Sequence, residues 1–520
     1  MPHLADTAPG TTDRARPVSL TVLAGLVALR LALPLVTRHG AWGFHRDEFL
    51  YFAMADHLTL SGMQFPPMIA IIAAAGRAVF GESVLSARVP AALGGAAITL
   101  VVLLFVRRLG GGRVACVLAW LALLAAPLFV RSSVLMHPVV FDQLWATMAL
   151  TALTLAAQER EPRWWLAVGL GLGLGALTKF SVAFTGLGVL SATVCVPALR
   201  AQLRTRWPWI AVLLGAILSL PGVMGQVTHD WPFLQQMTAL RRTQLDRVGA
   251  DDFLVGQALM LAGALILVLP ALWSGLRGEP RDRPAAIAGV TLVGLMLALH
   301  GKDYYAGPAY PVLIGTGALV LETLFRTHRV ARGVTFAALA ATAIGLWPVG
   351  VPSVGPAGML RYTAAMGLAE TTRTNRGLPL LLPQDYADML GWRELVDSVG
   401  ASLSSLSAAE RDDLTLVGGN YGLAGALAFY RDRDRLPYAV SVRGDFWAWG
   451  PGSASGNSVI LVSDSLAYPA LVRLYETVRI LRTVDNPWMV PEEQHVLIYH
   501  AKGARTPLAA LWPSLGPQWD

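Results

Sequence analysis

The sequence predicts an α-helical polytopic membrane protein with about eleven transmembrane helices and a C-terminal soluble α/β domain. Hydrophobic residues make up 54% of the 520 residues, and charged residues only 14%. Soluble domains carry about 25% charged residues, so this composition is typical of a multi-pass membrane protein. Because residues 351–520 are less apolar, we divide the chain into a tail (1–16), a membrane domain (17–350) and a C-terminal domain (351–520).

The membrane domain begins with the apolar run 17–37, which lacks a cleavage site of small residues and is predicted to be an uncleaved anchor. Several further runs are close to the lower length limit for crossing, about 17 residues. Glycines in the run 169–177 would let helix backbones approach closely. Residues 67–80, interrupted by Arg77, predict a surface-lying helix, with a short span as the alternative. The remaining predicted spans are roughly 88–106, 114–130, 139–157, 164–178, 181–199, 208–225, 254–274, 285–300, 308–325 and 333–350.

Arginine clusters fall in every second connection between the apolar runs. Since basic residues accumulate on the cytoplasmic side, the N-terminus and the tail 1–16 are predicted to be cytoplasmic. An odd number of spans then makes the C-terminal domain extracytoplasmic. The clusters are a topology signal and do not indicate nucleic-acid binding. The loops predicted outside are 38–87, 131–138, 226–253 and 300–307.

The C-terminal domain contains two predicted buried strands, 414–419 and 459–464. Helices are predicted after them, at 423–431 and 467–478. Neither strand ends in a GxGxxG or P-loop pattern, so these residues alone assign no catalytic role to the domain.

The outer loop 38–87 carries the charged tetrad His45, Arg46, Asp47 and Glu48. Charge is costly near hydrocarbon, so the tetrad indicates an active site at the outer membrane surface with Asp47 as the reacting carboxylate. Adjacent helical residues diverge by about 100°. One acid can therefore face a central cavity while the other pairs with a neighbour such as Arg46. The alternative is an acidic pair that stabilises a helix N-terminus.

Asp142 is the second candidate acid, because it lies just inside a predicted span near the same outer face. Its alternative is a structural hydrogen bond to Gln143, Arg131 or a neighbouring helix. Lysine occurs only at Lys179, Lys302 and Lys502. The first two lie at predicted outer ends, where a compact ammonium suits a phosphate, although snorkelling is the alternative.

Several short runs resemble bacterial glycosyltransferase family 39, of the GT-C type. This family is similar to protein O-mannosyltransferases and lipid A aminoarabinose transferases. The runs in the membrane domain are FHRDE at 44–48, Pro66-Pro67, LTKFS at 177–181 and GKDYYAGPAYP at 301–311. In the C-terminal domain they are LPQDYADMLGW at 382–392, GNYGLAGALAFY at 419–430 and FWAWGP at 446–451.

The resemblance implies a bacterial inner-membrane enzyme that takes a sugar from a polyprenyl-phosphate carrier. Asp47 matches the loop aspartate proposed as the base, Asp142 resembles a second acid, and Glu48 is kept as a third catalytic candidate. An anionic leaving group needs no general acid, so one carboxylate would suffice and inversion is expected. Candidate substrate-binding residues are His45, Arg46, Arg131, Lys179, Lys302, Tyr304 and Tyr305. The expected acceptor is a protein, glycolipid or glycan, with membrane lipids as further partners and no nucleic acid.

No cofactor or metal ligand is predicted. Relatives often carry an acid or histidine before the Pro-Pro pair, where this chain has Gln64-Phe65, so a divalent metal is left open. A secondary transporter and a membrane-anchored assembly protein are the competing classes. Convergence of Asp47, Asp142 and Lys302 in an outward cavity would favour the enzyme, and dispersal would count against it.

Overall fold

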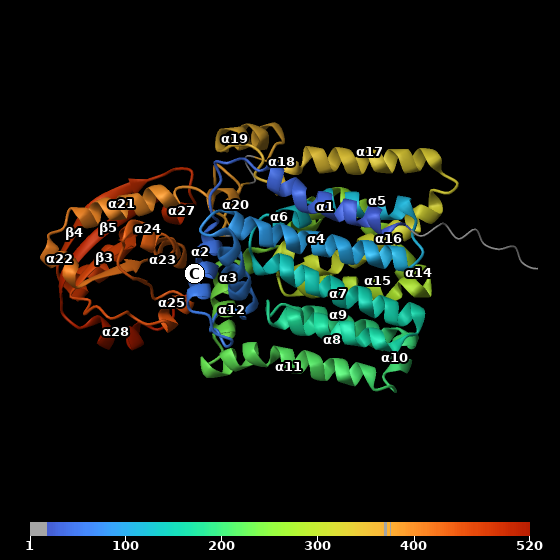
Figure 1. Cartoon of the computed structure of the whole chain (residues 1–520), viewed down its shortest axis with the longest axis horizontal. Coiled ribbons are helices and arrows are strands. Elements are labelled where there is room, and N and C mark those ends of the chain that lie inside the picture. The colour runs from blue at the N-terminus through green and yellow to red at the C-terminus, as the bar shows by residue number, and fades with distance from the viewer. Residues whose placement is uncertain (1–17, 369–371, 375, 520) are drawn as a thin grey trace, which may run out of the picture.

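The structure is a computed structural model that describes residues 18–368, 372–374 and 376–519. A bundle of long helices lies side by side, and a sheet domain caps one end of it (Figure 1). The expected tail 1–16 lies outside the described residues. Helices dominate the chain and a small sheet is confined to its C-terminal part, so the predicted helical class with an appended α/β domain is confirmed.

Each predicted span contains a helix. Within the described residues, five segments are long and apolar enough to cross a membrane: Leu20–Thr37, Leu85–Arg108, Pro138–Glu159, Trp207–Thr228 and Ala250–Arg277. The number of crossings therefore stays a prediction. The bundle helices are α1 (Leu20–Thr37), α4 (Leu85–Arg108), α5 (Arg113–Leu124), α7 (Pro138–Glu159), α8 (Trp165–Ala176), α9 (Val182–Cys195), α11 (Trp207–Thr228), α13 (Ala250–Leu261), α14 (Leu265–Arg277), α15 (Arg283–Ala298), α16 (Tyr310–Leu324) and α17 (Arg329–Gly345).

Glycines set the spacing around α8, as the sequence predicts. A Cβ added at Gly169 would lie 2.4 Å from the carbonyl oxygen of Ala211 on α11. One added at Gly171 would lie 2.7 Å from the carbonyl oxygen of Trp145 on α7. Backbones that approach this closely gain van der Waals contact, which drives helix association where lipid surrounds the bundle.

The arginine-rich connections meet at one end of the bundle. Arg108 Nε lies 2.6 Å from Glu159 Oε1, and Gln158 Nε2 donates to the carbonyl oxygen of Arg281 at 3.0 Å. Arg107 Nε donates to the carbonyl oxygen of Val18, at the start of the described chain, at 3.0 Å. The charged tetrad lies at the other end, beside the sheet domain (Figure 1).

Two shorter helices occupy the loop 38–87: α2 (Arg46–Asp56) and α3 (Met68–Phe80). Helix α3 buries Ile69, Ala70, Ala73 and Gly76 and packs against α2 and α4. It is too short to be one of the five segments that qualify as spans. Its surface-lying position stays a prediction.

The sheet domain holds five strands in the order β2-β1-β3-β5-β4. Strand β1 pairs in parallel with β2 and β3, whereas β5 pairs antiparallel with β3 and β4. The strands are β1 (Leu414–Gly418), β2 (Ala439–Val440), β3 (Ser458–Ser463), β4 (Tyr475–Asp485) and β5 (His495–Ala504). Its helices include α21 (Trp392–Ser404), α23 (Tyr421–Phe429), α26 (Tyr468–Leu474) and α27 (Pro491–Gln494).

Both predicted strands are confirmed, but the helix predicted over 467–478 is wrong at its end. Helix α26 stops at Leu474 and β4 begins at Tyr475. The stretch from Thr477 is rich in β-branched residues, which favour a pleated strand. The ladder with β5, which runs nearly the full length of β4, satisfies its backbone.

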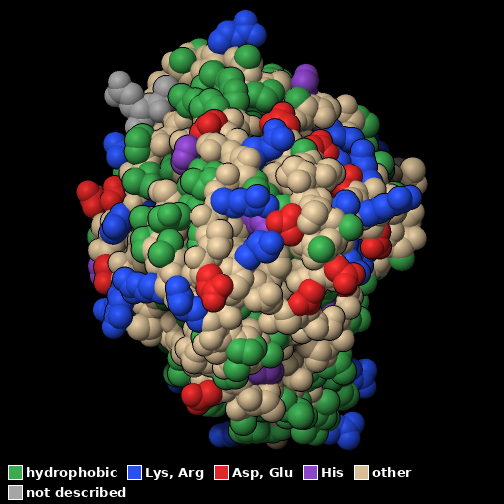
Figure 2. Space-filling view, turned by 90° about the vertical axis from the view of Figure 1, so that its left-hand side faces the viewer, with side chains coloured by type: hydrophobic (Ala, Val, Ile, Leu, Met, Phe, Trp, Pro, Cys, Tyr) green, Lys and Arg blue, Asp and Glu red, His purple; other side chains and the backbone are tan. Residues whose placement is uncertain are grey.

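The sheet domain and the outer loop share one apolar core. The ring centroids of Phe44 and Phe429 lie 4.8 Å apart, and those of Phe49 and Trp392 lie 5.6 Å apart. The connecting segment, which includes α19 (Pro356–Ala365) and α20 (Gln384–Ala387), packs against Trp42 and α6 (Pro127–Ser132). Acidic and basic side chains are interspersed over the outward face of the domain (Figure 2).

Candidate active site

The tetrad forms the start of α2. His45 is the N-cap residue, and its Nδ1 accepts a hydrogen bond from the Asp47 N–H at 3.1 Å. The Glu48 carboxylate accepts in return from the His45 N–H at 2.8 Å. This reciprocal capping box fixes the first turn of the helix, so the orientation of Asp47 is set by its neighbours.

Glu48 is a structural link between α2 and the bundle. Only 1% of its side chain is exposed, and it forms an ion pair with Arg88 on α4. Its Oε1 also accepts from the Met136 N–H at 3.0 Å. The predicted pairing of Glu48 with Arg46 is therefore wrong, because α2 directs Arg46 toward the C-terminal domain.

Arg46 faces two acids of that domain. Its Nε lies 3.5 Å from Asp388 Oδ1, and its Nη1 lies 3.5 Å from Glu493 Oε1. Both acids are almost fully buried. These contacts tie the start of α2 to the C-terminal domain, and a role of Arg46 in substrate binding stays a prediction.

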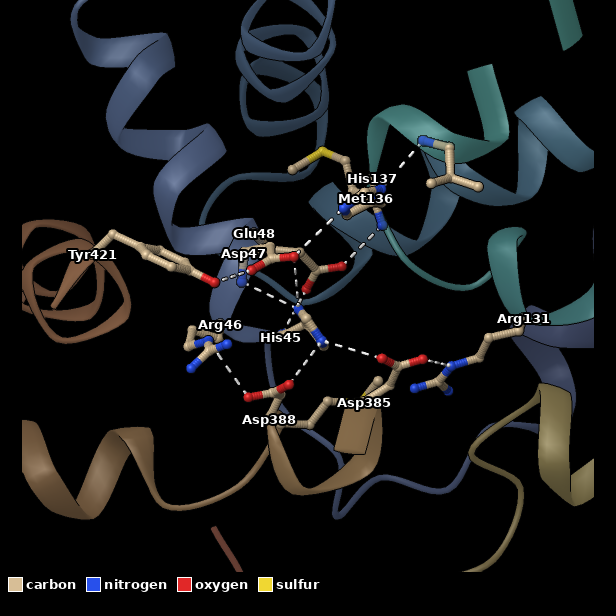
Figure 3. A network of polar contacts seen from close by, with 12 residues as sticks. His45, Arg46, Asp47, Glu48, Arg131, Met136, His137, Asp385, Asp388 and Tyr421 are labelled. Carbon is tan, nitrogen blue, oxygen red and sulfur yellow. Dashed lines mark hydrogen bonds and ion pairs between the residues drawn. The ribbon is translucent and has the colours of Figure 1, made fainter. Parts of the chain in front are cut away.

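Asp47 keeps 23% of its side chain exposed. Its Oδ1 accepts a hydrogen bond from the Tyr421 hydroxyl at 2.8 Å, and its Oδ2 lies 3.5 Å from His137 Nε2 (Figure 3). Burial raises the pKa of the Asp47 carboxyl, but contacts with His137, His45 and Arg46 lower it by more. The net pKa lies well below its usual range, so Asp47 is ionised, as a proton acceptor must be.

His137 is a second histidine cap. Its Nδ1 accepts from the Val139 N–H at 3.2 Å, at the start of α7. A neutral imidazole carries one ring proton, so that proton sits on Nε2 and faces Asp47. Burial lowers the pKa of His137 by more than Asp47 raises it, which favours this neutral form.

The capping role of His45 also determines whether this group of residues can hold a metal. His45 Nε2 lies 3.6 Å from Asp388 Oδ2 and 3.9 Å from Asp385 Oδ1, a grouping with the residue types of a cation site. The cap occupies the Nδ1 lone pair of His45, so Nε2 keeps its proton and cannot act as a ligand. The donor set therefore does not fit a divalent metal. Asp388 pairs with Arg46 instead, and Asp385 with Arg131.

Lysines and tyrosines form a second polar group beside Asp47. Lys179 Nζ lies 4.5 Å from the ring centroid of Tyr305 and 5.2 Å from that of Tyr304. Burial raises the pKa of Tyr305, but Lys179 and Lys302 lower it by more. The net pKa is lowered, which indicates a positive potential suited to an anion. Lys302 also interacts electrostatically with Asp47, which links the two groups through their charges.

Asp142 and Arg131 border these groups. Asp142 is 5% exposed, accepts from Ser181 Oγ at 3.0 Å and interacts electrostatically with Lys179. Arg131 Nε donates to Asp385 at 2.8 Å, while its two terminal nitrogens are buried without a hydrogen-bond partner among the described residues. Asp142 therefore accepts a hydrogen bond from a neighbouring segment, which is the structural alternative to a catalytic role that the sequence left open.

Four further residues of the site were not predicted from the sequence: His137, Tyr421, Asp385 and Asp388. The last three lie in runs already linked to the resemblance, 382–392 and 419–430, which was the available signal. The sequence alone does not indicate that Tyr421 contacts Asp47, because 374 positions separate the two residues.

The comparisons confirm the resemblance to the glycosyltransferases of GT-C type. Residues 64–224 match the family model described as dolichyl-phosphate-mannose-protein mannosyltransferase. That range includes Pro66-Pro67, His137 and Lys179 and begins after Asp47.

Two relatives are identical to this chain at about a quarter of the aligned positions. Lipid A galacturonosyltransferase RgtD of Rhizobium johnstonii is 26% identical over 275 residues, covering 49% of this chain and 55% of that protein. Undecaprenyl phosphate-alpha-4-amino-4-deoxy-L-arabinose arabinosyl transferase 1 of Pseudomonas fluorescens is 28% identical over 354 residues, covering 61% of each. The chain thus spans little more than half the length of the relatives it matches.

A solved structure shares the fold. ArnT from Cupriavidus metallidurans, bound to undecaprenyl phosphate, superposes with a TM-score of 0.60. The superposition covers 92% of this chain and 97% of that one at 16% sequence identity. The likeness therefore extends over the bundle and the sheet domain and shows the fold alone.

Proposed function

We propose that this protein is an inverting glycosyltransferase. It moves a sugar from a polyprenyl-phosphate carrier to an acceptor hydroxyl at the outer face of a bacterial inner membrane. One observation carries the proposal. Asp47 is the most accessible of the three candidate acids, at 23% exposure against 1% for Glu48 and 5% for Asp142, and it interacts electrostatically with Lys302.

The proposed reaction is a single displacement. Asp47 takes the proton of the acceptor hydroxyl while the acceptor oxygen forms a bond to the anomeric carbon. The bond from that carbon to the phosphate oxygen breaks, and its electron pair leaves with the phosphate. Because attack and departure occur on opposite faces of the sugar, the configuration inverts.

The lysine and tyrosine group is proposed to bind the carrier phosphate. Lys179 and Lys302 would stabilise the negative charge that the departing phosphate keeps, and the hydroxyls of Tyr304 and Tyr305 would donate to its oxygens. Asp142 is proposed to orient Lys179, since the two interact electrostatically. Glu48 is proposed to act only through the fold.

The distribution of arginines supports a site at the outer face of the membrane. The site lies at the end of the bundle opposite the arginine-rich connections, and the positive-inside rule assigns those connections to the cytoplasm. The C-terminal domain is accordingly extracytoplasmic. A transporter is disfavoured because its polar residues would lie near the bilayer midplane on broken helices. Here they gather at one end with a domain attached.

The relatives suggest the first substrates to try. The name of the Pseudomonas relative gives an undecaprenyl-phosphate-linked amino sugar, and the name of the Rhizobium relative gives lipid A and a galacturonosyl group. Purified protein in liposomes should transfer label from a panel of undecaprenyl-phosphate sugars to lipid A or another hydroxyl-bearing glycolipid, protein or glycan. It should also bind undecaprenyl phosphate itself, with binding weakened in Lys302→Ala. Folded protein that does not bind undecaprenyl phosphate would overturn the proposal.

A further inference from the structure

The sheet domain reaches the candidate base through α23. Strand β1 ends at Gly418, and Asn420 caps the helix, its Oδ1 accepting from the Leu423 N–H at 2.9 Å. This strand–turn–helix unit places Tyr421 in the first turn of α23. Whether Tyr421 reaches Asp47 then depends on how closely α23 packs against α2.

Two glycines allow α23 to pack closely against α2. A Cβ added at Gly422 would lie 2.4 Å from Cγ of Arg46. One added at Gly425 would lie 2.8 Å from Cβ of Phe49 and 3.0 Å from its carbonyl carbon. With larger residues the helices would have to separate, so the glycines hold Tyr421 at a fixed position relative to Asp47.

We propose, building on the proposed function, that Tyr421 is a positioning residue for Asp47 and that the sheet domain is therefore part of the catalytic unit. Its hydroxyl holds Oδ1 of the carboxylate at 2.8 Å, which leaves Oδ2 to receive the acceptor proton. The contact of Oδ2 with His137, at 3.5 Å, is longer, and an incoming hydroxyl can replace it.

Arg46 supports this arrangement from the other side. Its guanidinium carbon lies 5.1 Å from the ring centroid of Tyr421, a cation–π contact that restricts the ring. Arg46 is itself held by Asp388 and Glu493. The C-terminal domain thus holds the Asp47 carboxylate directly through Tyr421 and indirectly through Arg46. A fixed position suits a base that must be preorganised.

The rival interpretation is that Tyr421 only joins the domain to the bundle. Tyr421→Phe distinguishes the two interpretations, because it removes the hydroxyl and keeps the ring. Tyr430→Phe is the matched control: Tyr430 lies at the other end of α23, and its ring centroid is 6.0 Å from that of Phe49. Both variants are made in the full-length protein, and their thermal unfolding is compared with wild type.

Tyr421→Phe should lower kcat by about tenfold or more, because a hydrogen bond to a charged group is lost, while the KM for the donor stays unchanged. The acid limb of its pH–rate profile should move to higher pH, since losing a donor to the carboxylate form favours the protonated form. Tyr430→Phe should match wild type in all three respects.

A second readout does not need turnover. Carbodiimides react with protonated carboxyls, so mass spectrometry of Asp47 labelling at one mildly acidic pH reports its protonation. Labelling should be faster in Tyr421→Phe than in wild type or Tyr430→Phe. Equal labelling and equal kcat in all three would overturn the inference. If Asp47→Asn kept wild-type turnover, the assignment of Asp47 as the base would fail instead, whatever the labelling showed. If folded wild type neither bound undecaprenyl phosphate nor transferred a sugar, the proposed function itself would fail.

Discussion

At the scale of single residues, two adjacent acids have separate roles. Asp47 and Glu48 diverge by about 100° around α2, so one faces the polar groups of the site and the other faces the bundle. Glu48 is buried in its ion pair with Arg88, whereas Asp47 is partly exposed to solvent. Chain position alone could not separate them, because the partner of Glu48 lies 40 residues away on another helix.

Glu48→Gln should destabilise the protein by about 3–5 kcal/mol, because it leaves the buried Arg88 without a counter-charge. Asp47→Asn should change stability far less, since Asp47 is partly exposed and its replacement keeps the same shape. Chemical unfolding of both variants in detergent measures the difference. Equal stabilities would refute the assignment of Glu48 to the fold.

Glu493 on α27 makes stability depend on pH. Burial raises the pKa of its carboxyl from the ordinary 4.5 to about 7, against the opposing effect of Arg46. A raised pKa means that this group stabilises the fold fully below pH 4.5, and that the contribution is lost as pH rises through 7. A shift of this size corresponds to roughly 3 kcal/mol.

Glu493→Gln cannot ionise, so its Tm should fall less than that of wild type as pH rises through this interval. The two proteins are compared by thermal unfolding at several pH values in the same detergent. Parallel Tm curves would show that Glu493 does not titrate in this way.

At the scale of elements, the contact between α2 and α23 is the joint between the two parts of the protein. Gly425→Ala should cost about 1–3 kcal/mol of stability and lower the rate of transfer, because the added methyl would overlap Phe49. Gly400→Ala on α21 is the control, because its Cβ would meet nothing within 4 Å. The control should be neutral or stabilise by up to about 1 kcal/mol. Full activity and stability in Gly425→Ala would contradict the tight packing.

The bundle helices could be predicted because apolar runs and polar breaks reveal them directly. Strands β1 and β3 could be predicted from their short apolar runs. Strand β4 could not, because a strand with several exposed positions has no continuous apolar run and is defined by its pairing with β5. The strand conformation of β4 is therefore determined by its pairing with β5 and not by its local sequence.

At the scale of the whole molecule, the predicted topology places the sheet domain outside. Cysteine introduced at Ser453, in a background lacking Cys116 and Cys195, should react with an impermeant thiol reagent in intact spheroplasts. Cysteine at Thr327, at the arginine-rich end, should react only after lysis. The reverse pattern would invert the topology and place the site in the cytoplasm.

The candidate site could be predicted from the sequence only on the membrane side. Asp47, Lys179 and Lys302 stand out because charge is rare there. In the C-terminal half of the site, Asp385, Asp388 and Tyr421 do not stand out by composition, because they are ordinary residues of a soluble domain. The family resemblance of the runs that contain them was the available signal. Their meaning comes from the docking of that domain on α2.

The central claim is that Asp47 accepts the proton of the acceptor. Asp47→Asn keeps the size of the side chain and removes the basic oxygen, so turnover should fall by about 10²–10⁴-fold. Binding of undecaprenyl phosphate should be retained, because the lysine and tyrosine group is intact. The measurement is sugar transfer by purified wild type and variant with the same donor and acceptor. Wild-type turnover by a folded Asp47→Asn protein would contradict the mechanism.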